Sequence, residues 1–451
     1  ADSEGVEVEA AEQPEEGAGD TAEDTAAEGD EAASPAAEVE AAEGATDAVP
    51  EDAATAVQQS DESVEEGAEP VEEGAEPALE SATEMVEDAE AEAGQAAEAA
   101  GEGIEDTEAA LEDALREAEQ AAGAGETVED GDWCGGHWVE CLRIAGRLEG
   151  RPELIEEARD RTERLRPKLE KDDQFRGHRF YYSAARLFAE TGDPRLRTLA
   201  LAAAYAVRSM AIPQNGAMPI GHEVQVKSTT LASRRIVAVD NVHPNLRLDF
   251  WAGPETGDQV FDDGAKRMLD LTIRDFVRAD GSTVEFLEYH DTEDRILRHF
   301  TLLGVHDDSC WSRGQAWAIA GFLRGWQEFG ETRYRDAAAR VWGYWQGKVG
   351  NGVPPWDFDD PDGPRDTSAA AIVVEQLARM AVADPNTEAR RFTEHLDPMI
   401  EALAEHVRPT GRLVDGCFNR PKRFADRSEL IWGTAYLLMA LCYLEEGEVP
   451  C

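Results

Sequence analysis

From Trp133 onward, hydrophobic positions recur at helical spacing, and short polar stretches containing a glycine interrupt them. At four interruptions an apolar segment ends at a glycine, a few polar residues follow, and a large apolar residue opens the next segment. Because a glycine readily adopts the left-handed conformation that ends a helix, each stretch predicts an antiparallel helical hairpin. The glycines are Gly150, Gly192, Gly257 and Gly330, and the apolar residues after them are Leu154, Leu196, Phe261 and Tyr334.

The rest of this region extends the helical pattern. Helices are predicted at about 367–383, 388–407 and 429–445, and strand patterns are confined to 228–231 and 284–289. The predicted fold class is therefore all-α. Six helical hairpins within 132–451 would close into a double ring, an (α/α)6 barrel, with long loops forming a bowl at one end. Long loops on a rigid scaffold commonly carry functional residues.

Composition changes abruptly near Gly131. Residues 1–131 contain 45 acidic residues, one basic residue (Arg116) and no aromatic residue, in a chain of net charge −54. Such a segment cannot bury enough apolar surface to offset its chain entropy. We expect a disordered acidic tail over 1–131 and a folded domain over 132–451. Because the tail lacks the Lys and Arg that phosphate contacts need, no nucleic-acid partner is expected.

Other whole-chain features limit the choices further. Apolar runs fall short of the roughly 20 residues that cross a bilayer, so we expect no integral membrane segment. The six cysteines form no CxxC pair, and we expect most to be buried free thiols. The chain starts at Ala, which leaves open a cytoplasmic location or export after signal-peptide removal. The oligomeric state is also open.

The strongest chemical signal is WSRGQAWAIAGF, Trp311–Phe322, which places two tryptophans and an arginine at the start of an apolar helix. Indole faces suit sugar rings, and a guanidinium suits a carboxylate. Trp311, Arg313 and Trp317 therefore indicate a site for an acidic saccharide.

A second apolar segment, Val239–Ala252, has Asp240 as its second residue. Two interpretations are open. Its side chain could cap the helix that follows, which is a common structural use of Asp. At the mouth of a helical ring lined by aromatic side chains, its pKa could instead be raised so that it serves as a general acid. Further along, Asp366, Thr367 and Ser368 are expected to cap the helix at 367–383.

Four segments together resemble the unsaturated glucuronyl hydrolases of glycoside hydrolase family 88. The resemblance covers about 131–447, essentially the whole predicted folded part. WSRGQAW followed by PPWDF and RDTSAAA is its most specific part, and the other two segments support it. The four are WCGGHW (Trp133–Trp138), VDNVHPNLRLDFWA (Val239–Ala252), WSRGQAWAIAGF (Trp311–Phe322) and PPWDFDDPDGPRDTSAAAI (Pro354–Ile372).

The resemblance implies an (α/α)6 barrel that acts on oligosaccharides ending in a 4,5-unsaturated uronic acid. In that family an Asp protonates C4 of the enol ether and helps water add at C5, and Asp240 falls on that position. Trp311, Arg313 and Trp317, together with Trp133, fall on positions that line the sugar site. The resemblance also permits Arg313 to pair with the uronate carboxylate.

The chain departs from the family pattern at several positions. Phe175 stands where the family has a second Asp in an HDxGF pattern, and Asp173, two residues upstream, is the possible replacement carboxylate. Glu285 replaces a usual His, Leu303 replaces a usual Gln, and GTAY at 433–436 replaces GDYY. Two alternatives therefore remain open: a catalytically inactive carbohydrate-binding protein of this fold, and a barrel hydrolase for a different saccharide.

Four histidines lie close to these motifs but have no helical ligand spacing, so we expect no metal site and no cofactor. They are His137, His178, His243 and His306.

Overall fold

The computed structural model describes residues 132–226, 229–233, 235–383 and 387–447. The predicted acidic tail at 1–131 lies outside the described residues.

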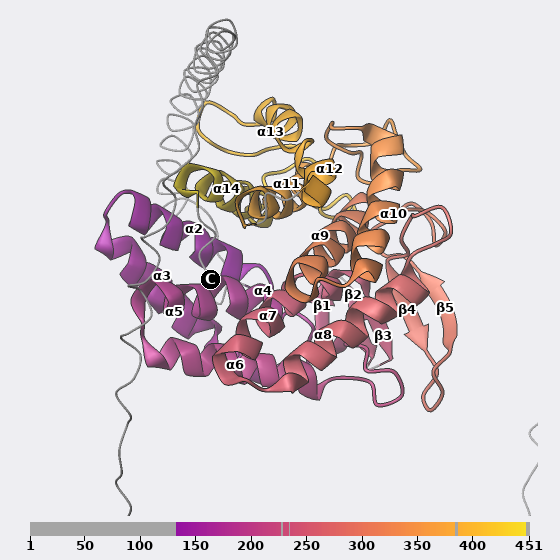
Figure 1. The fold of residues 1–451 in the computed structure, drawn as a ribbon, viewed down its shortest axis with the longest axis horizontal. Coiled ribbons are helices and arrows are strands. Elements are labelled where there is room, and N and C mark those ends of the chain that lie inside the picture. The colour runs from indigo at the N-terminus through magenta and orange to yellow at the C-terminus, as the bar shows by residue number, and fades with distance from the viewer. Residues whose placement is uncertain (1–131, 227–228, 234, 384–386, 448–451) are drawn as a thin grey trace, which may run out of the picture. The chain divides into compact units, whose positions relative to one another are not determined.

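Helical hairpins dominate the described chain (Figure 1). All four predicted turn glycines adopt a left-handed conformation, with φ between 61° and 69°, which confirms the predicted turns. Asp193 and Asp258 cap the helices after two of these turns by accepting a backbone N–H. The paired helices are α2 (Gly135–Leu148) with α3 (Pro152–Leu165), α5 (Arg186–Thr191) with α6 (Pro194–Ser209), α7 (Pro244–Thr256) with α8 (Gln259–Leu271), and α9 (Ser312–Phe329) with α10 (Thr332–Val349).

The other predicted helices are also present. α11 (Thr367–Ala383) and α14 (Ile431–Glu446) match the predicted ranges, whereas the predicted helix at 388–407 is divided into α12 (Thr387–Thr393) and α13 (Leu396–Ala404). Before α5, the short α4 (Arg176–Phe180) continues through a π-helical turn, η2 (Tyr181–Ala185). The remaining helical turns are η1 (Arg166–Glu170), η3 (Val239–Val242) and η4 (Thr272–Phe276).

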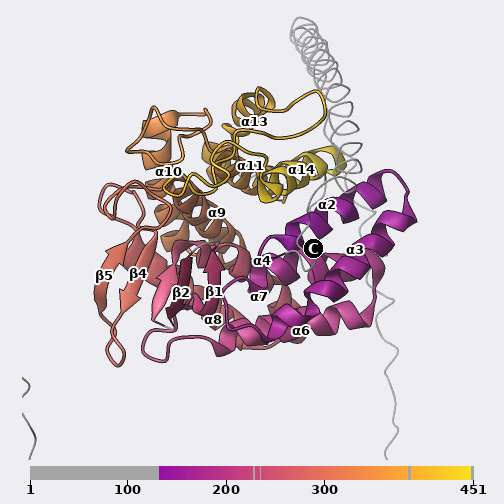
Figure 2. The same cartoon turned by 180° about the vertical axis from the view of Figure 1, so that it is seen from behind.

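One set of helices forms a closed circuit of neighbours, which can be followed in Figures 1 and 2. α2 packs against α4, α4 against α7, and η3, which leads into α7, against α9. α9 then packs against α11, α11 against α14, and α14 returns to α2. Buried aromatic rings contact one another inside this circuit: the Tyr436 ring centroid lies 5.6 Å from Tyr182 and 5.7 Å from Trp317. The interior is therefore a packed core.

The described strands form two small antiparallel sheets. In the three-stranded sheet, β3 pairs with β4 and β4 with β5. Ala238 lies opposite Phe286, and the next residue along, Val239, donates its N–H to the carbonyl of Glu285 at 3.0 Å. This pairing leads straight into η3 and so fixes the backbone of Asp240. The strands are β1 (Gly221–Val226), β2 (Thr229–Ser233), β3 (Ile236–Ala238), β4 (Phe286–Tyr289) and β5 (Ile296–Phe300); β2 and β4 overlap the predicted segments.

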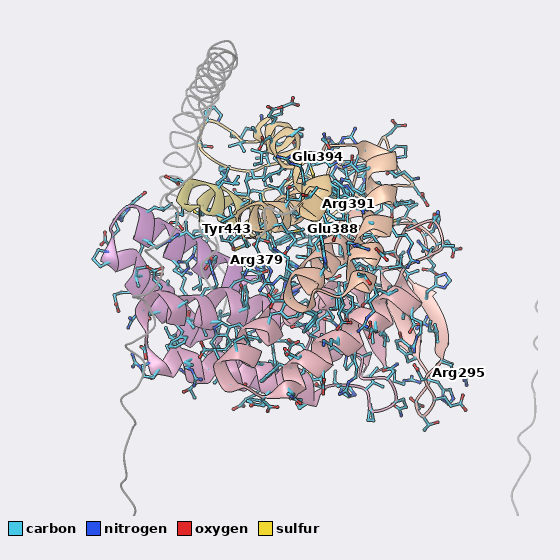
Figure 3. The ribbon with its side chains drawn as sticks, viewed as in Figure 1. Arg295, Arg379, Glu388, Arg391, Glu394 and Tyr443 are labelled. Atoms are coloured by element: carbon cyan, nitrogen blue, oxygen red, sulfur yellow. The ribbon has the colours of Figure 1, made fainter. Side chains whose placement is uncertain are left out.

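The outer helices carry charged side chains, many of them exposed (Figure 3). Glu388 of α12, for example, forms an ion pair with Arg335 of α10 at 2.9 Å. Cys141, Cys310, Cys417 and Cys442 are buried free thiols, as predicted, and Cys134 is half-buried; Cys451 lies outside the described residues. Within the described ranges, no helix is long and apolar enough to cross a membrane.

Gly177 allows α4 and α7 to approach closely. Its N–H donates to Asn245 Oδ1 at 2.8 Å, and a Cβ added at Gly177 would lie 2.6 Å from the backbone nitrogen of Asn245. We expect Gly177→Ala to lower the free energy of unfolding by about 1–3 kcal/mol, because backbone must move to make room. Gly343→Ala is the matched control, since Gly343 is exposed on α10 with open space around it. That change should stabilise the protein by about 0.5–1 kcal/mol. Urea unfolding of both variants tests this, and equal stabilities would contradict the close approach.

Candidate active site

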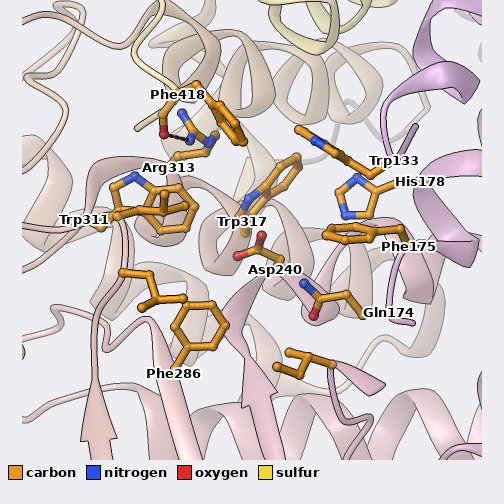
Figure 4. A pocket seen from close by; sticks show the side chains of 13 residues that line it. Trp133, Gln174, Phe175, His178, Asp240, Phe286, Trp311, Arg313, Trp317 and Phe418 are labelled. Atoms are coloured by element: carbon orange, nitrogen blue, oxygen red, sulfur yellow. Dashed lines mark hydrogen bonds between the residues drawn. The ribbon is translucent and has the colours of Figure 1, made fainter. Parts of the chain in front are cut away.

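A pocket opens beside η3 and the three-stranded sheet (Figure 4). Its volume is about 630 Å³, counted with the solvent space at its mouth. Segments far apart in the sequence meet here: the lining comes from the start of the described chain, from α4 and the turn before it, from η3, β4 and α9, and from the loops before β1, α9 and α14. The lining residues are Trp133, Gln174, Phe175, His178, Ile220, Asp240, Phe286, Leu302, Leu303, Trp311, Arg313, Trp317 and Phe418.

Asp240 points into the middle of this group, below Trp317 and between Trp311 and Gln174 (Figure 4). The interpretation of Asp240 as a helix cap is wrong, because its side chain makes no capping bond; the helix α7 begins later, at Pro244, after His243. The Oδ1 atom is buried and has no hydrogen-bond partner among the described residues. Burial raises the pKa of Asp240 to about 6, against the opposing effects of the Arg313 charge and its own backbone N–H.

The three tryptophans singled out from the sequence all line the pocket. Trp311 and Trp317 lie at the start of α9 and are almost fully buried, whereas Trp133 is half-buried. Trp133 packs against Trp432, with ring centroids 4.6 Å apart. The indole N–H of Trp317 has no acceptor in the described part of the chain. The pocket is therefore lined by aromatic rings that the core holds in place, and Trp133 is the most exposed of the three.

Arg313 also reaches the pocket, but its guanidinium already has several protein partners. It forms a buried ion pair with Asp366. The same group donates to the carbonyls of Cys417 and Phe418, at 2.7 Å and 2.9 Å, and lies 4.6 Å over the ring of Trp311. Asp366 in turn accepts the N–H of Ser368 at 3.1 Å, a capping contact of the predicted kind. Arg313 therefore braces the pocket wall, and its charge is matched by Asp366.

Phe175, which stands in the column of the family's second Asp, and Asp173, the possible replacement carboxylate, take different positions. Phe175 lines the pocket, as its place in the motif predicts. Asp173 does not line it, because both carboxylate oxygens bind Arg179 Nη1 at 2.9 Å and Oδ1 also accepts the N–H of Phe175. The structure thus gives Asp173 partners that hold the turn before α4.

Several lining residues escaped the sequence reasoning. Gln174, Ile220, Phe286, Leu302 and Phe418 join the pocket through loops and strand ends. Their local sequences carry no motif, and only the packing of distant segments brings them together. Gln174 alone could have been predicted, because it directly precedes Phe175, the residue at the position of the family's second Asp.

The buried histidines are neutral and do not form a metal site. Burial lowers the pKa of His137 to about 3, and it lowers the pKa values of His178 and His243 well below their usual range. None of their ring nitrogens has a hydrogen-bond partner among the described residues. In the same ranges, no group of three or more His, Cys, Asp or Glu is arranged to hold a metal ion. His306 is exposed.

Sequence comparisons find relatives over part of the chain. No family model matches it. The chain is 30% identical over 217 residues to an unsaturated glucuronyl hydrolase from Bacillus sp. (strain GL1), which is 45% of this chain and 57% of the relative. It is 25% identical over 330 residues to an unsaturated chondroitin disaccharide hydrolase from Streptococcus pyogenes serotype M1, 70% of this chain and 81% of the relative. The match to the Bacillus protein thus spans little more than half of that relative's length.

Solved structures are similar over more of the chain. An unsaturated glucuronyl hydrolase from Bacillus sp. GL1, described as responsible for the degradation of glycosaminoglycan, superposes with a TM-score of 0.66 at 25% identity, covering 75% of this chain and 95% of that one. A variant of an unsaturated glucuronyl hydrolase with dGlcA-Glc-Rha-Glc superposes with a TM-score of 0.64 at 26% identity, covering 71% and 88%.

Proposed function

We propose that this chain, which resembles the unsaturated glucuronyl hydrolases in sequence and fold, is a glycoside hydrolase for oligosaccharides that end in a 4,5-unsaturated uronic acid. The closed circuit of helices supports an (α/α)6 barrel as its architecture. The observation that carries the proposal is Asp240, a carboxyl group with a raised pKa in a pocket walled by three tryptophans.

The proposed chemistry is the one that the resemblance implies, with Asp240 as the acid and base. Asp240 donates its proton to C4 of the C4=C5 double bond, and water adds at C5 while Asp240 accepts a proton from that water. The product is a hemiketal at C5. Opening of the ring leaves a hemiacetal at C1, which collapses to an aldehyde and releases the alcohol of the neighbouring sugar. One water molecule is consumed, and Asp240 returns to its protonated state.

The surroundings suit these steps. A carboxyl group with a pKa of about 6 stays partly protonated near neutral pH and can act both as an acid and as a base. Trp133, which is half-buried, offers a surface on which a sugar ring can stack, and the nearly buried Trp311 and Trp317 complete the aromatic lining.

A second candidate is supported by the composition of the wall. Phe175, Phe286, Leu302 and Leu303 make much of the pocket apolar. Such a wall offers few hydrogen-bond partners to sugar hydroxyl groups, so it favours a different saccharide whose end group needs fewer of them. Comparing the turnover of unsaturated uronides, saturated uronides and other saccharides separates this candidate from the first.

The test is the ultraviolet absorbance of the conjugated enol in a panel of unsaturated uronyl disaccharides, with the saturated uronides as controls. We expect the absorbance to fall with time and the saturated compounds to remain intact. Binding of the disaccharides without any loss of absorbance would instead support the carbohydrate-binding alternative. Cleavage of the saturated uronides would indicate an ordinary glycosidase.

A further inference from the structure

Four residues of the pocket lining carry buried polar atoms that have no hydrogen-bond partner among the described residues. A buried polar atom without a partner is costly and uncommon in a native fold. Arg313, by contrast, is a lining residue whose guanidinium is already bound by Asp366. A ligand that satisfies the unpartnered atoms would therefore gain binding energy there. The atoms are Gln174 Oε1, both ring nitrogens of His178, Asp240 Oδ1 and Trp317 Nε1.

His178 enters the pocket from α4 and lies between aromatic rings (Figure 4). Its side chain is almost fully buried. The imidazole centroid lies 5.3 Å from that of Trp133 and 5.9 Å from that of Trp317, and both contacts are edge to face. Phe175, about one helical turn earlier, lies 5.6 Å away. These contacts hold the ring in place but leave both nitrogens without a hydrogen-bond partner in the described ranges.

The chemistry of the unpartnered atoms points to a hydroxyl group as their ligand. Burial lowers the pKa of His178 well below its usual range, and the neighbouring His137 and Arg179 act in the same direction. The neutral imidazole has one N–H donor and one acceptor nitrogen. Gln174 Oε1, from the turn before α4, is a further acceptor. A sugar hydroxyl both donates and accepts, whereas a carboxylate has no proton to donate and would leave these acceptors unsatisfied.

His178 is a feature of this chain and not of the HDxGF pattern. Read along residues 174–178, the pattern has Asp where this chain has Phe175, and Phe where it has His178. Residues three apart on a helix lie on one face. The polar and the aromatic residue have thus exchanged places about one helical turn apart, and the polar one is a neutral donor and acceptor instead of an acid.

We propose that His178 is a specificity-determining residue that hydrogen-bonds a ring hydroxyl, at C2 or C3, of the sugar at the end of the substrate. The hydroxyl edge of that sugar then lies against α4. Much of the remaining wall is apolar, so this contact is one of the few that can distinguish one end sugar from another. The identity of the end sugar as an unsaturated uronic acid rests on the proposed function.

His137 offers a matched control for His178. Both side chains are fully or almost fully buried, and their ring centroids lie 5.8 Å apart. The ring nitrogens of His137 also have no hydrogen-bond partner among the described residues, but His137 does not belong to the pocket lining. A purely structural role would be common to both histidines, whereas a contact with a sugar is open to His178 alone.

The first experiment measures binding without turnover. Isothermal titration calorimetry gives the Kd values of an unsaturated uronyl disaccharide and of its analogues that lack the C2 or the C3 hydroxyl of the end sugar, in an Asp240→Asn background. Adding His178→Phe should weaken binding of the parent compound by about 10- to 100-fold, because a hydroxyl then stays unpaired in the pocket. It should leave the affinity of one of the two analogues nearly unchanged. Adding His137→Phe should alter none of the three affinities.

Two results would overturn the proposal. Equal weakening of all three compounds by His178→Phe would show that the ring only packs the wall, and unchanged affinities would show that it makes no contact. His178→Gln keeps a neutral donor and acceptor, so it should preserve part of the discrimination between the parent and the analogue. If neither variant folds, the background protein still decides, since equal affinities for all three compounds would also contradict the contact.

The second experiment separates this inference from the proposed function. It measures kcat/KM for the same three compounds with the wild-type protein and with His178→Phe. Binding that depends on the hydroxyl and on His178, in a protein that never hydrates the double bond, would support the contact and contradict the hydrolase activity. Turnover of all three compounds in ratios that His178→Phe leaves unchanged would contradict the contact and leave the activity intact. A protein that neither binds nor converts any of them contradicts both.

Discussion

Asp240→Asn is expected to lower kcat/KM for an unsaturated uronyl disaccharide by about 10²- to 10⁴-fold, the usual contribution of a general acid and base. Asn has nearly the same shape as a protonated Asp but cannot release a proton. The pocket around it should stay intact, because Asp240 makes no capping bond and its Oδ1 has no hydrogen-bond partner among the described residues. The loss should therefore appear in kcat, with KM changed much less.

Asp308→Asn is the matched control. Asp308 is exposed and pairs with His299 at 2.7 Å, away from the lining of the pocket, so this variant should retain the wild-type rate. The measurement is the initial rate of loss of enol absorbance at several pH values, since a single pH could confuse a shifted pH profile with a lost acid. An Asp240→Asn enzyme that keeps more than about a tenth of the wild-type rate at every pH would contradict the role of Asp240.

The helical framework could be predicted because its signals are local. Gly192, Gly257 and Gly330 each end a helix in the left-handed conformation that the pattern predicts. The convergence of Trp133, Asp240 and Trp311 in one pocket was predictable only through the resemblance, because nothing in the spacing of three distant segments says that they meet. The boundary near Gly131 stays a prediction, because the residues before it lie outside the described part.

The rest of the site depended on contacts that no local pattern reports. The ion pair between Arg313 and Asp366 joins residues 53 positions apart, and it changes Arg313 from a free cation into a neutralised brace. The hydrogen bonds of Glu285 come from a loop 16 to 18 residues further along. A pKa depends on burial and on such partners, so the titration of Asp240 could not be read from residue types.

Arg313→Ala is expected to lower the free energy of unfolding by about 3–5 kcal/mol, because it leaves Asp366 as an uncompensated buried charge. Asp366 is fully buried and Arg313 is 3% exposed, so water cannot replace the lost partner without opening the wall. The variant also leaves the carbonyls of Cys417 and Phe418 without their guanidinium donor. Urea unfolding, followed by tryptophan fluorescence, measures the change.

Two further variants test whether Arg313 stabilises the pocket wall or only binds a substrate carboxylate. Arg333→Ala breaks the ion pair between Arg333 and Asp270, two side chains that are each about half exposed. This change should lower the free energy of unfolding by less than about 1 kcal/mol. Adding Asp366→Asn to Arg313→Ala removes the stranded charge, so the double variant should be more stable than Arg313→Ala alone. If Arg313 served only to bind a substrate carboxylate, Arg313→Ala would unfold like wild type and lose affinity alone. A brace instead predicts that saccharide affinity falls together with stability, because Trp311 lies directly under the guanidinium.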